Sequence, residues 1–191
     1  MKIEQSKIIK VKLVDLDRLD PITVFIEDIE LGKGKITIEC YGKSWSYYWG
    51  GMSGKTVSEF FSTIGIDYLS NCLWDHSRDQ CEDDYDGVQK LVKDRVLDYR
   101  RDYRITKESA RAMYDIEDWS EYAPSHQYAE WSVPDDVEND DFETISLNYE
   151  SIPTKNTAEY NYLIRIVSAV NEALSALNQE SNKTLKVGIK Q

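Results

Sequence analysis

The loop Gly50–Thr56 (GGMSGKT) carries the residue types of a phosphate-binding site, between an expected strand and an expected helix. A Walker A loop has its first glycine five residues before the glycine that precedes the lysine, and Trp49 occupies that position. The stretch 45–49 before the loop is polar and aromatic, whereas the buried parallel strand of a nucleotide-binding domain reads as an apolar run. We therefore expect a turn and then a helix, with Thr56 as N-cap and Glu59 completing a capping box.

Cys72, His76 and Cys81 come closest to a set of metal ligands, with Cys40 or a nearby carboxylate as a fourth. Zinc sites usually contain tighter CxxC or HxxxH pairs than these spacings provide. Three cysteines at irregular spacing do not indicate a disulfide framework either. We expect Cys72 to be a small buried residue on a helix, and we expect no bound metal or cofactor.

Acid–base or nucleophilic catalysis finds little support in the sequence. His76 and His126 are the only imidazoles, and neither lies in a signature such as GxSxG. Carboxylates are abundant, but clustered in an acidic run they are usually a solvated face of the protein. The sequence therefore predicts a binding protein and not an enzyme, with a small metal-dependent enzyme as the least favoured alternative.

The formal net charge of −12 is concentrated in the middle of the chain, where residues 75–144 hold 9 basic and 21 acidic side chains. From Ala112 to Thr154 there is no Lys or Arg and there are 12 carboxylates. Such a local excess attracts a basic partner and repels nucleic acid. We therefore expect a protein partner with a basic, nucleic-acid-binding surface, and no direct binding of nucleic acid.

The same acidic stretch contains seven large aromatic residues, which a disordered acidic linker would lack. We expect part of it to pack on the domain as an extended or loop-rich arm, with Trp119 and Trp131 as contact anchors. Its carboxylates either imitate the phosphates of a nucleic acid or form a solubilising surface. The predicted partner-binding residues are Asp115, Asp118, Trp119, Glu121, Trp131, Asp135, Asp136, Glu138, Asp140, Asp141 and Glu143.

Trp45, Tyr47 and Trp49 fall on one face of an expected strand. Aromatic ladders of this kind can stack bases or sugars. Lys43 and Lys55 are the only basic residues nearby, so we favour packing of these rings beneath a helix.

The order of the elements predicts an α+β fold, in which an N-terminal antiparallel sheet of three to four strands is packed by helices, including a long C-terminal helix. Alternating or β-branched runs predict strands at 8–14, 22–31, 36–41 and 45–49. We expect a single domain over 1–191, with 1–55 mainly β, 56–118 mainly α, 119–156 an acidic aromatic-containing arm and 157–178 the C-terminal helix.

The helices are indicated by apolar periodicity and by capping residues. Residues 88–103 form an amphipathic pattern, and Thr106 is placed to cap a helix after it. Thr157 is placed to cap the helix 158–177, whose broad apolar face should lie across the sheet. The N-terminus has no signal-peptide pattern and no apolar run reaches the length of a membrane span, so we expect a cytoplasmic location.

Three phrases carry a resemblance to a known family: CYGKSWSYYWGGMSGKTVSEFF, DYLSNCLW and IPTKNTAEYNYLIRIVSAVNEAL. They are similar to stretches in a family of small accessory proteins of tailed bacteriophages and enterobacterial prophages, over roughly residues 35–180. The resemblance implies expression in the cytoplasm of a bacterial host, and it implies no catalytic residues. Phage accessory proteins often inhibit host defence, as anti-CRISPR or anti-restriction proteins, and some are acidic mimics of DNA.

The leading hypothesis is therefore a phage-encoded protein that binds and inhibits or modulates a nucleic-acid-handling or defence complex of the host. The alternative is a structural or assembly accessory protein that binds another phage protein through an aromatic surface.

Overall fold

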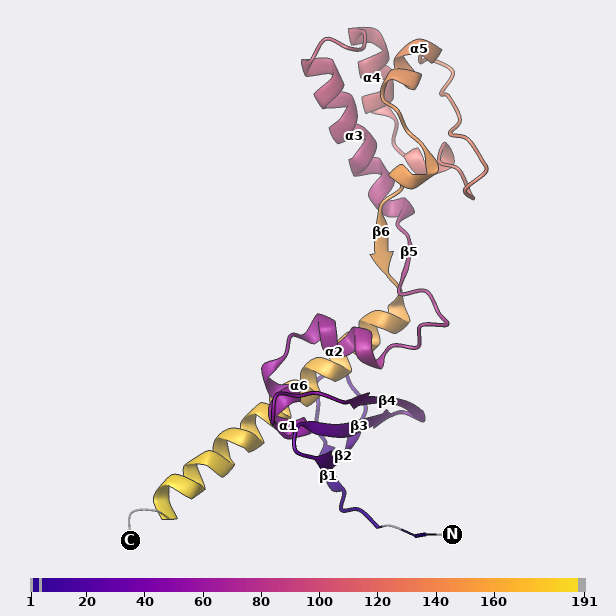
Figure 1. Cartoon of the computed structure of the whole chain (residues 1–191). Coiled ribbons are helices and arrows are strands. Elements are labelled where there is room, and N and C mark those ends of the chain that lie inside the picture. Colours follow the sequence, from indigo (N-terminus) through magenta and orange to yellow (C-terminus); the bar gives the residue numbers. More distant parts are fainter. Residues whose placement is uncertain (1, 4, 189–191) are drawn as a thin grey trace. The chain divides into compact units, whose positions relative to one another are not determined.

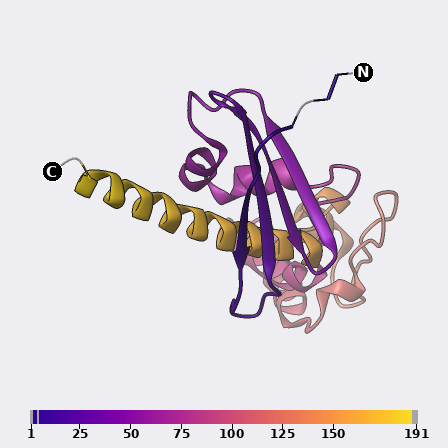
Figure 2. The ribbon, with the colours of Figure 1, turned by 90° about the horizontal axis from the view of Figure 1, so that it is seen from below.

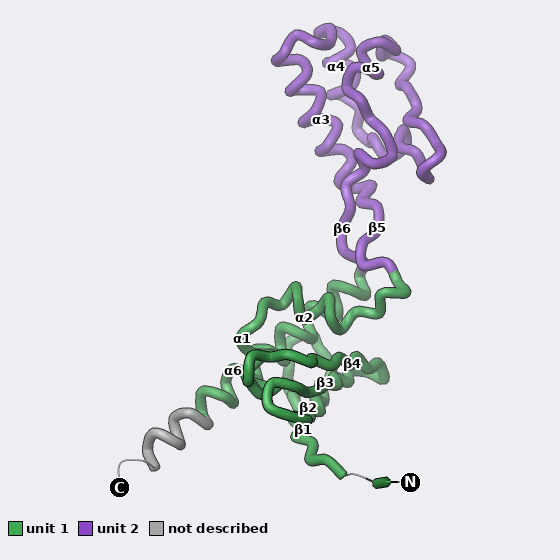
Figure 3. The backbone as a smooth tube through the Cα atoms, viewed as in Figure 1, with its two compact units in different colours: residues 1–78, 158–191 green, residues 79–157 purple. Residues whose placement is uncertain are grey.

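The computed structural model describes residues 2–3 and 5–188, with side chains as far as residue 180. The chain divides into two compact units (Figure 3), unit 1 with residues 1–78 and 158–191 and unit 2 with residues 79–157. Each unit has its own hydrophobic core. The single-domain organisation stays a prediction; in sequence, unit 2 is an insertion between two parts of unit 1.

Unit 1 contains a sheet of four strands in the order β1-β2-β3-β4, with every neighbouring pair antiparallel. Tyr41 and Gly42 link the last two strands and have φ angles of 48° and 74°, as a two-residue hairpin turn requires. This meander confirms the predicted N-terminal sheet. Its strands are β1 (Ile9–Leu13), β2 (Ile22–Glu30), β3 (Lys33–Cys40) and β4 (Lys43–Trp49).

One face of this sheet is covered by helices α1 (Val57–Thr63), α2 (Ile66–Leu73) and α6 (Ala158–Gly188), and α6 crosses the strands (Figures 1 and 2). Alternate residues of β2 and β3 point into this layer and are buried, because successive side chains of a strand face opposite sides. The result confirms the predicted α+β fold with a long C-terminal helix on the sheet. The buried strand residues are Ile22, Val24, Ile26, Ile36, Ile38 and Cys40.

Helix α6 extends to Gly188, beyond the predicted end near residue 178. The apolar periodicity stops at Leu177, but residues 178–187 contain neither Gly nor Pro to break the helix. The apolar pattern had therefore marked the packed part of the helix and not its whole length.

Unit 2 is built around α3 (Tyr85–Arg101) and α4 (Lys107–Asp115), which present Val88, Val92, Val96 and Met113 to a common core. Two short strands pair antiparallel where the chain enters and leaves the unit. The remaining elements are β5 (Cys81–Asp83), η1 (Trp119–Glu121), α5 (Asn139–Thr144), η2 (Tyr149–Ser151) and β6 (Thr154–Asn156).

The acidic stretch, which we expected to pack in part on the domain as an extended or loop-rich arm, packs against α3 and α4 within unit 2. The physical reason is that its aromatic and aliphatic side chains supply half of a hydrophobic core that the two helices leave open. Those buried residues are Trp119, Trp131, Val137, Phe142, Ile145 and Ile152.

Helix α1 begins where the sequence predicts. Thr56 and Glu59 form the expected capping box, and Asp28 adds a carboxylate oxygen 2.7 Å from the backbone nitrogen of Val57. At this approach between α1 and the sheet stands Gly34 on β3. A side chain there would meet Val57 and the carbonyl oxygen of Glu27, 2.6 Å from the added Cβ.

We expect Gly34→Ala to lower the stability of unit 1 by about 1–3 kcal/mol, because the new methyl group has to displace backbone. Native-state hydrogen exchange of the β2 and β3 amides measures this change locally. Gly51→Ala is the control, since a Cβ at Gly51 meets nothing within 4 Å. Equal protection in the two variants would contradict the packing argument.

Helix α4 depends on a buried carboxylate from a distant part of unit 2. The backbone nitrogen of Thr106, its N-cap, donates to Asp141 at 3.1 Å, and the Thr106 hydroxyl bonds to the same oxygen. Burial by itself raises the pKa of the Asp141 carboxyl, but hydrogen bonds from Thr106 and Ser109 outweigh it and hold the pKa below its usual range.

We expect Asp141→Asn to reduce the free energy of unfolding by about 1.5–3 kcal/mol at neutral pH, since it removes a charged acceptor. The depressed pKa means that this stabilisation is complete above the ordinary aspartate value of about 3.9 and is lost as the pH falls through the folded-state value. Urea denaturation at pH 7 and pH 3 measures both effects. Asp140→Asn, at an exposed neighbour, is the control. If the difference in unfolding free energy between wild type and Asp141→Asn were the same at pH 3 as at pH 7, the role given to the Asp141 carboxylate would be refuted.

Candidate partner-binding site

The net charge of the protein lies in unit 2. Residues 79–157 hold 9 basic and 21 acidic side chains, whereas the rest of the chain holds 14 of each. Unit 1 is therefore neutral overall and unit 2 carries −12. An electrostatic interaction with a basic partner accordingly belongs to unit 2.

Trp119 is the residue around which the acidic stretch folds, and it is fully buried. Its indole Nε1 donates to the carbonyl oxygen of Met113 at 3.1 Å. Its backbone nitrogen donates to Gln89 on α3 at 2.9 Å, and the amide group of Gln89 donates in turn to the carbonyl oxygen of Ile116 at 2.7 Å. The ring stacks on Phe142 of α5, with ring centroids 6.3 Å apart. These contacts fasten the start of the stretch to α3 and bring α5 against Trp119.

Further hydrogen bonds from α3 hold the irregular chain at Pro124 and after α5. The hydroxyl of Tyr85 donates to the carbonyl oxygen of Pro124 at 3.0 Å. The guanidinium of Arg95 donates to the carbonyl oxygens of Ile145 and Ser146, at 3.1 and 2.8 Å. Helix α3 thus satisfies backbone carbonyls that a loop without regular structure leaves unpaired.

Trp119, Trp131 and Phe142 turn inward, and nearly all the carboxylates of the stretch turn outward. Eleven of the 12 carboxylates between Ala112 and Thr154 are exposed, and Asp141 is the exception. Five of the exposed ones lie within nine residues, on α5 and the turn before it. We call these five the acidic cluster: Asp135, Asp136, Glu138, Asp140 and Glu143.

Three of the predicted contact carboxylates have structural partners. Asp115 forms an ion pair with Arg111 at 2.6 Å. Asp118 caps η1, and its hydrogen bonds from Ser120 hold the pKa of the carboxyl below its usual range. Asp141 is buried against Thr106. Glu121 and the acidic cluster form no ion pair with any described residue, so their charge is directed to solvent.

The two predicted contact anchors are buried. Trp119 is 0% exposed and Trp131 is 7% exposed, and their ring centroids lie 6.5 Å apart. The sequence identified them as important because large aromatic residues are rare in acidic linkers. Their place in the structure is the core of unit 2, where they hold the acidic cluster in position.

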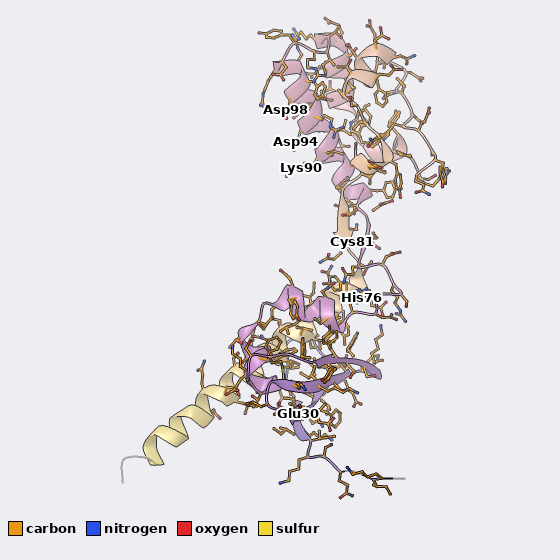
Figure 4. The ribbon with its side chains drawn as sticks, in the orientation of Figure 1. Glu30, His76, Cys81, Lys90, Asp94 and Asp98 are labelled. Atoms are coloured by element: carbon orange, nitrogen blue, oxygen red, sulfur yellow. The ribbon has the colours of Figure 1, made fainter. Side chains whose placement is uncertain are left out.

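Carboxylates on α3 do not extend the acidic cluster. Figure 4 shows Lys90, Asp94 and Asp98 in a row along this helix. Asp98 is paired with Arg101 at 3.2 Å. The outer side of α3 therefore mixes both signs of charge, unlike α5 and the turn before it.

Beside the acidic cluster is a cleft of about 470 Å³ that the sequence analysis missed. Its lining mixes apolar side chains with polar ones, and Glu130 and Glu143 contribute exposed carboxylates. No periodicity links the residues that form it, because they come from the irregular segment 127–133 and from the end of α5 and the residues after it, 142–149. They include Glu130, Trp131, Val133, Phe142, Glu143 and Leu147.

The glycine-rich loop and the Cys72, His76 and Cys81 set, which the sequence analysis also considered, show no binding geometry among the described residues. Lys55 of the glycine-rich loop donates to the hydroxyl of Thr63 at 3.0 Å, and the loop leads into the capped helix α1 as expected. Cys72 is half-buried on α2, while His76 and Cys81 are exposed. Within the described residues, no three His, Cys, Asp or Glu side chains gather closely enough to hold a metal ion.

Unit 1 offers a different surface, which we call the aromatic edge: Trp45 and Tyr47 of β4, and Tyr68 of α2. Trp49 is buried, as core packing predicts, but Tyr47 and Tyr68 are 36% and 49% exposed. Cys72 lies beside Tyr47 and Tyr68 and raises the pKa of both phenols. At Tyr47 the main cause is the charge of Cys72, followed by a hydrogen bond to it. At Tyr68 the main cause is a hydrogen bond to Cys72.

Comparison with known proteins gives a family and no function. No curated protein and no solved structure matches the chain. None of the described helices combines the length and apolarity needed to cross a bilayer. A protein-family model described as a phage family, phiTE 072, matches residues 1–176. This match covers nearly the whole chain, and the protein therefore belongs to that phage family.

Proposed function

We propose that this phage protein binds a host protein that handles nucleic acid, and inhibits or modulates it, through the acidic cluster of unit 2. The observation that supports this most is the separation of charge, because unit 2 carries the entire −12 and unit 1 is neutral. A charge excess confined to one unit directs a basic surface to that unit, where a uniform excess would only favour solubility.

The chemistry of the partner follows from the sign and order of these charges. Five exposed carboxylates within nine residues repel nucleic acid and suit a groove of Lys and Arg side chains that normally binds phosphates. Helix α5 and the buried Phe142 hold these carboxylates in a defined array, which lowers the entropic cost of binding. Restriction and CRISPR complexes of the host have such grooves, so host-defence inhibition by mimicry of DNA is the form of the proposal we favour.

Changing Asp135, Asp136 and Asp140 to lysine tests the proposal in cells that carry a restriction or CRISPR system. Wild-type protein should raise the plating of a targeted phage, and the triple variant should lose this protection. With purified target, the affinity should fall at least about tenfold, since like charges across an interface cost several kcal/mol. The affinity of the wild-type protein for this target should also fall steeply as the salt concentration rises.

The matched control reverses three exposed carboxylates of unit 1, Asp17, Glu39 and Glu172, and so changes the net charge equally. Protection should survive in this control. Asp141 is left unchanged in both variants because it supports α4. Full protection by the variant of the acidic cluster would refute the proposed contact.

A second candidate function is assembly with another phage protein through the aromatic edge. Strand β4 is the outermost strand of its sheet, and its exposed tyrosines are of the type enriched in protein interfaces. Such an association depends on apolar contact and is insensitive to salt, which separates it from the leading proposal.

We expect Tyr47→Ser with Tyr68→Ser to abolish co-purification with a protein of the phage particle, at both low and high salt. Tyr103→Ser with Tyr128→Ser is the control, because these residues are 86% and 85% exposed in unit 2. The aromatic edge would be excluded as the contact if the control variant lost co-purification. It would also be excluded if the wild-type protein failed to co-purify at high salt.

A further inference from the structure

We infer that the cleft of unit 2 binds an arginine side chain that projects from the partner protein. This inference rests on the proposed function, because it names the side chain through which a basic partner would be anchored. Interfaces usually depend on a few side chains seated in pockets, and arginine is prominent among them.

The cleft has the shape and lining for a long cationic side chain. Its volume of about 470 Å³ exceeds the needs of a single side chain and leaves space for the adjoining backbone. Val133, Phe142 and Leu147 line it with apolar atoms, against which the methylene groups of arginine pack. Tyr149 also lines the cleft, and its hydroxyl donates a hydrogen bond to the Asp83 carboxylate at 2.7 Å, which holds the ring in place.

The charge around the cleft selects a cation. Glu130 and Glu143 are exposed and form no ion pair with a described residue, and no Lys or Arg lines the cleft. The guanidinium of Arg95 on α3 is the nearby cation in the sequence of contacts described above, but it already donates to the carbonyl oxygens of Ile145 and Ser146. Two carboxylates at one cleft are therefore without a cation, in a unit whose surface already repels anions.

Trp131, which lines the cleft, carries an unpaired donor, and this favours a peptide as the occupant. The indole Nε1 of Trp131 is buried and has no hydrogen-bond acceptor among the described residues. Leaving such a donor unpaired costs about 1–3 kcal/mol. If the indole shifts on binding, a backbone carbonyl of the bound segment can supply the missing acceptor, whereas a metal ion or a simple amine cannot.

Arginine fits better than lysine for a geometric reason. Its planar guanidinium presents five donors in a fixed fork, so that two carboxylates can be engaged at once, and it stacks on aromatic rings. Lysine offers a compact charge that stays more strongly hydrated. We therefore expect discrimination between two peptides of equal charge.

The test uses a fluorescent peptide with three arginines separated by glycines, and a second peptide with lysine in their place. Binding to the full chain is measured by anisotropy. Glu130→Gln with Glu143→Gln should weaken the arginine peptide at least about tenfold, because charge-assisted hydrogen bonds are lost. The lysine peptide should bind the wild type more weakly than the arginine peptide.

Asp135→Asn with Asp136→Asn is the matched control, since it removes the same charge from exposed positions that do not line the cleft. Its effect should be about threefold or less and should vanish at high salt. In an NMR titration, the indole N–H signal of Trp131, assigned with Trp131→Phe, should move. The indole signal of Trp119, which is bonded to Met113, should not.

The outcomes separate the two proposals. Failure of both peptides to bind wild-type protein at low salt would overturn the inference together with binding to a basic partner. Equal weakening by the two variant pairs, or equal affinity for the two peptides, would overturn the arginine cleft alone and leave the proposed function standing. Preferential loss in the variant of Glu130 and Glu143, with a shifted Trp131 signal, supports the cleft.

Discussion

Burial of Trp119 against α3 is the interaction on which unit 2 depends. Removing 150–250 Å² of aromatic surface from water contributes roughly 4–6 kcal/mol at about 25 cal/mol per Å². Repulsion between neighbouring exposed carboxylates costs only a few tenths of a kcal/mol per pair. Aromatic burial therefore outweighs the charge repulsion, and an acidic stretch that contains no Lys or Arg adopts a defined structure.

The same burial explains the properties of the surface. When Trp119, Trp131 and Phe142 turn inward, the carboxylates between them, except Asp141, face solvent. Gln89 and Arg95 on α3 then satisfy the polar backbone of the irregular chain. Hydrophobic packing thus fixes the position of charges that make no ion pairs of their own, which gives the acidic cluster the order of a binding surface.

The two units solve different physical problems. Unit 1 buries one face of a four-stranded sheet under helices and has balanced charge, so that it is an ordinary α+β unit. Unit 2 has two helices whose core is completed by a segment with little regular structure. Segments of that kind commonly carry binding residues on a rigid support, and the proposed function uses unit 2 in this way.

The sequence by itself determined the strands of the four-stranded sheet and the positions of the longer helices. Alternation located the strands, and Thr56, Glu59 and Thr106 located two helix starts, because strand pairing and capping are decided by residues close together in the chain. The sequence also located the charge and the aromatic residues of the stretch 112–154.

Only the tertiary structure decided which residues of that stretch are exposed. Trp119, Trp131 and Asp141 are buried, while Glu130, which the sequence analysis did not select, lines a cleft. An irregular segment has no repeat that assigns alternate residues to the inside and the outside. Its inward positions are set by contacts with α3, α4 and α5, up to tens of residues away, and the cleft exists only after those contacts have formed.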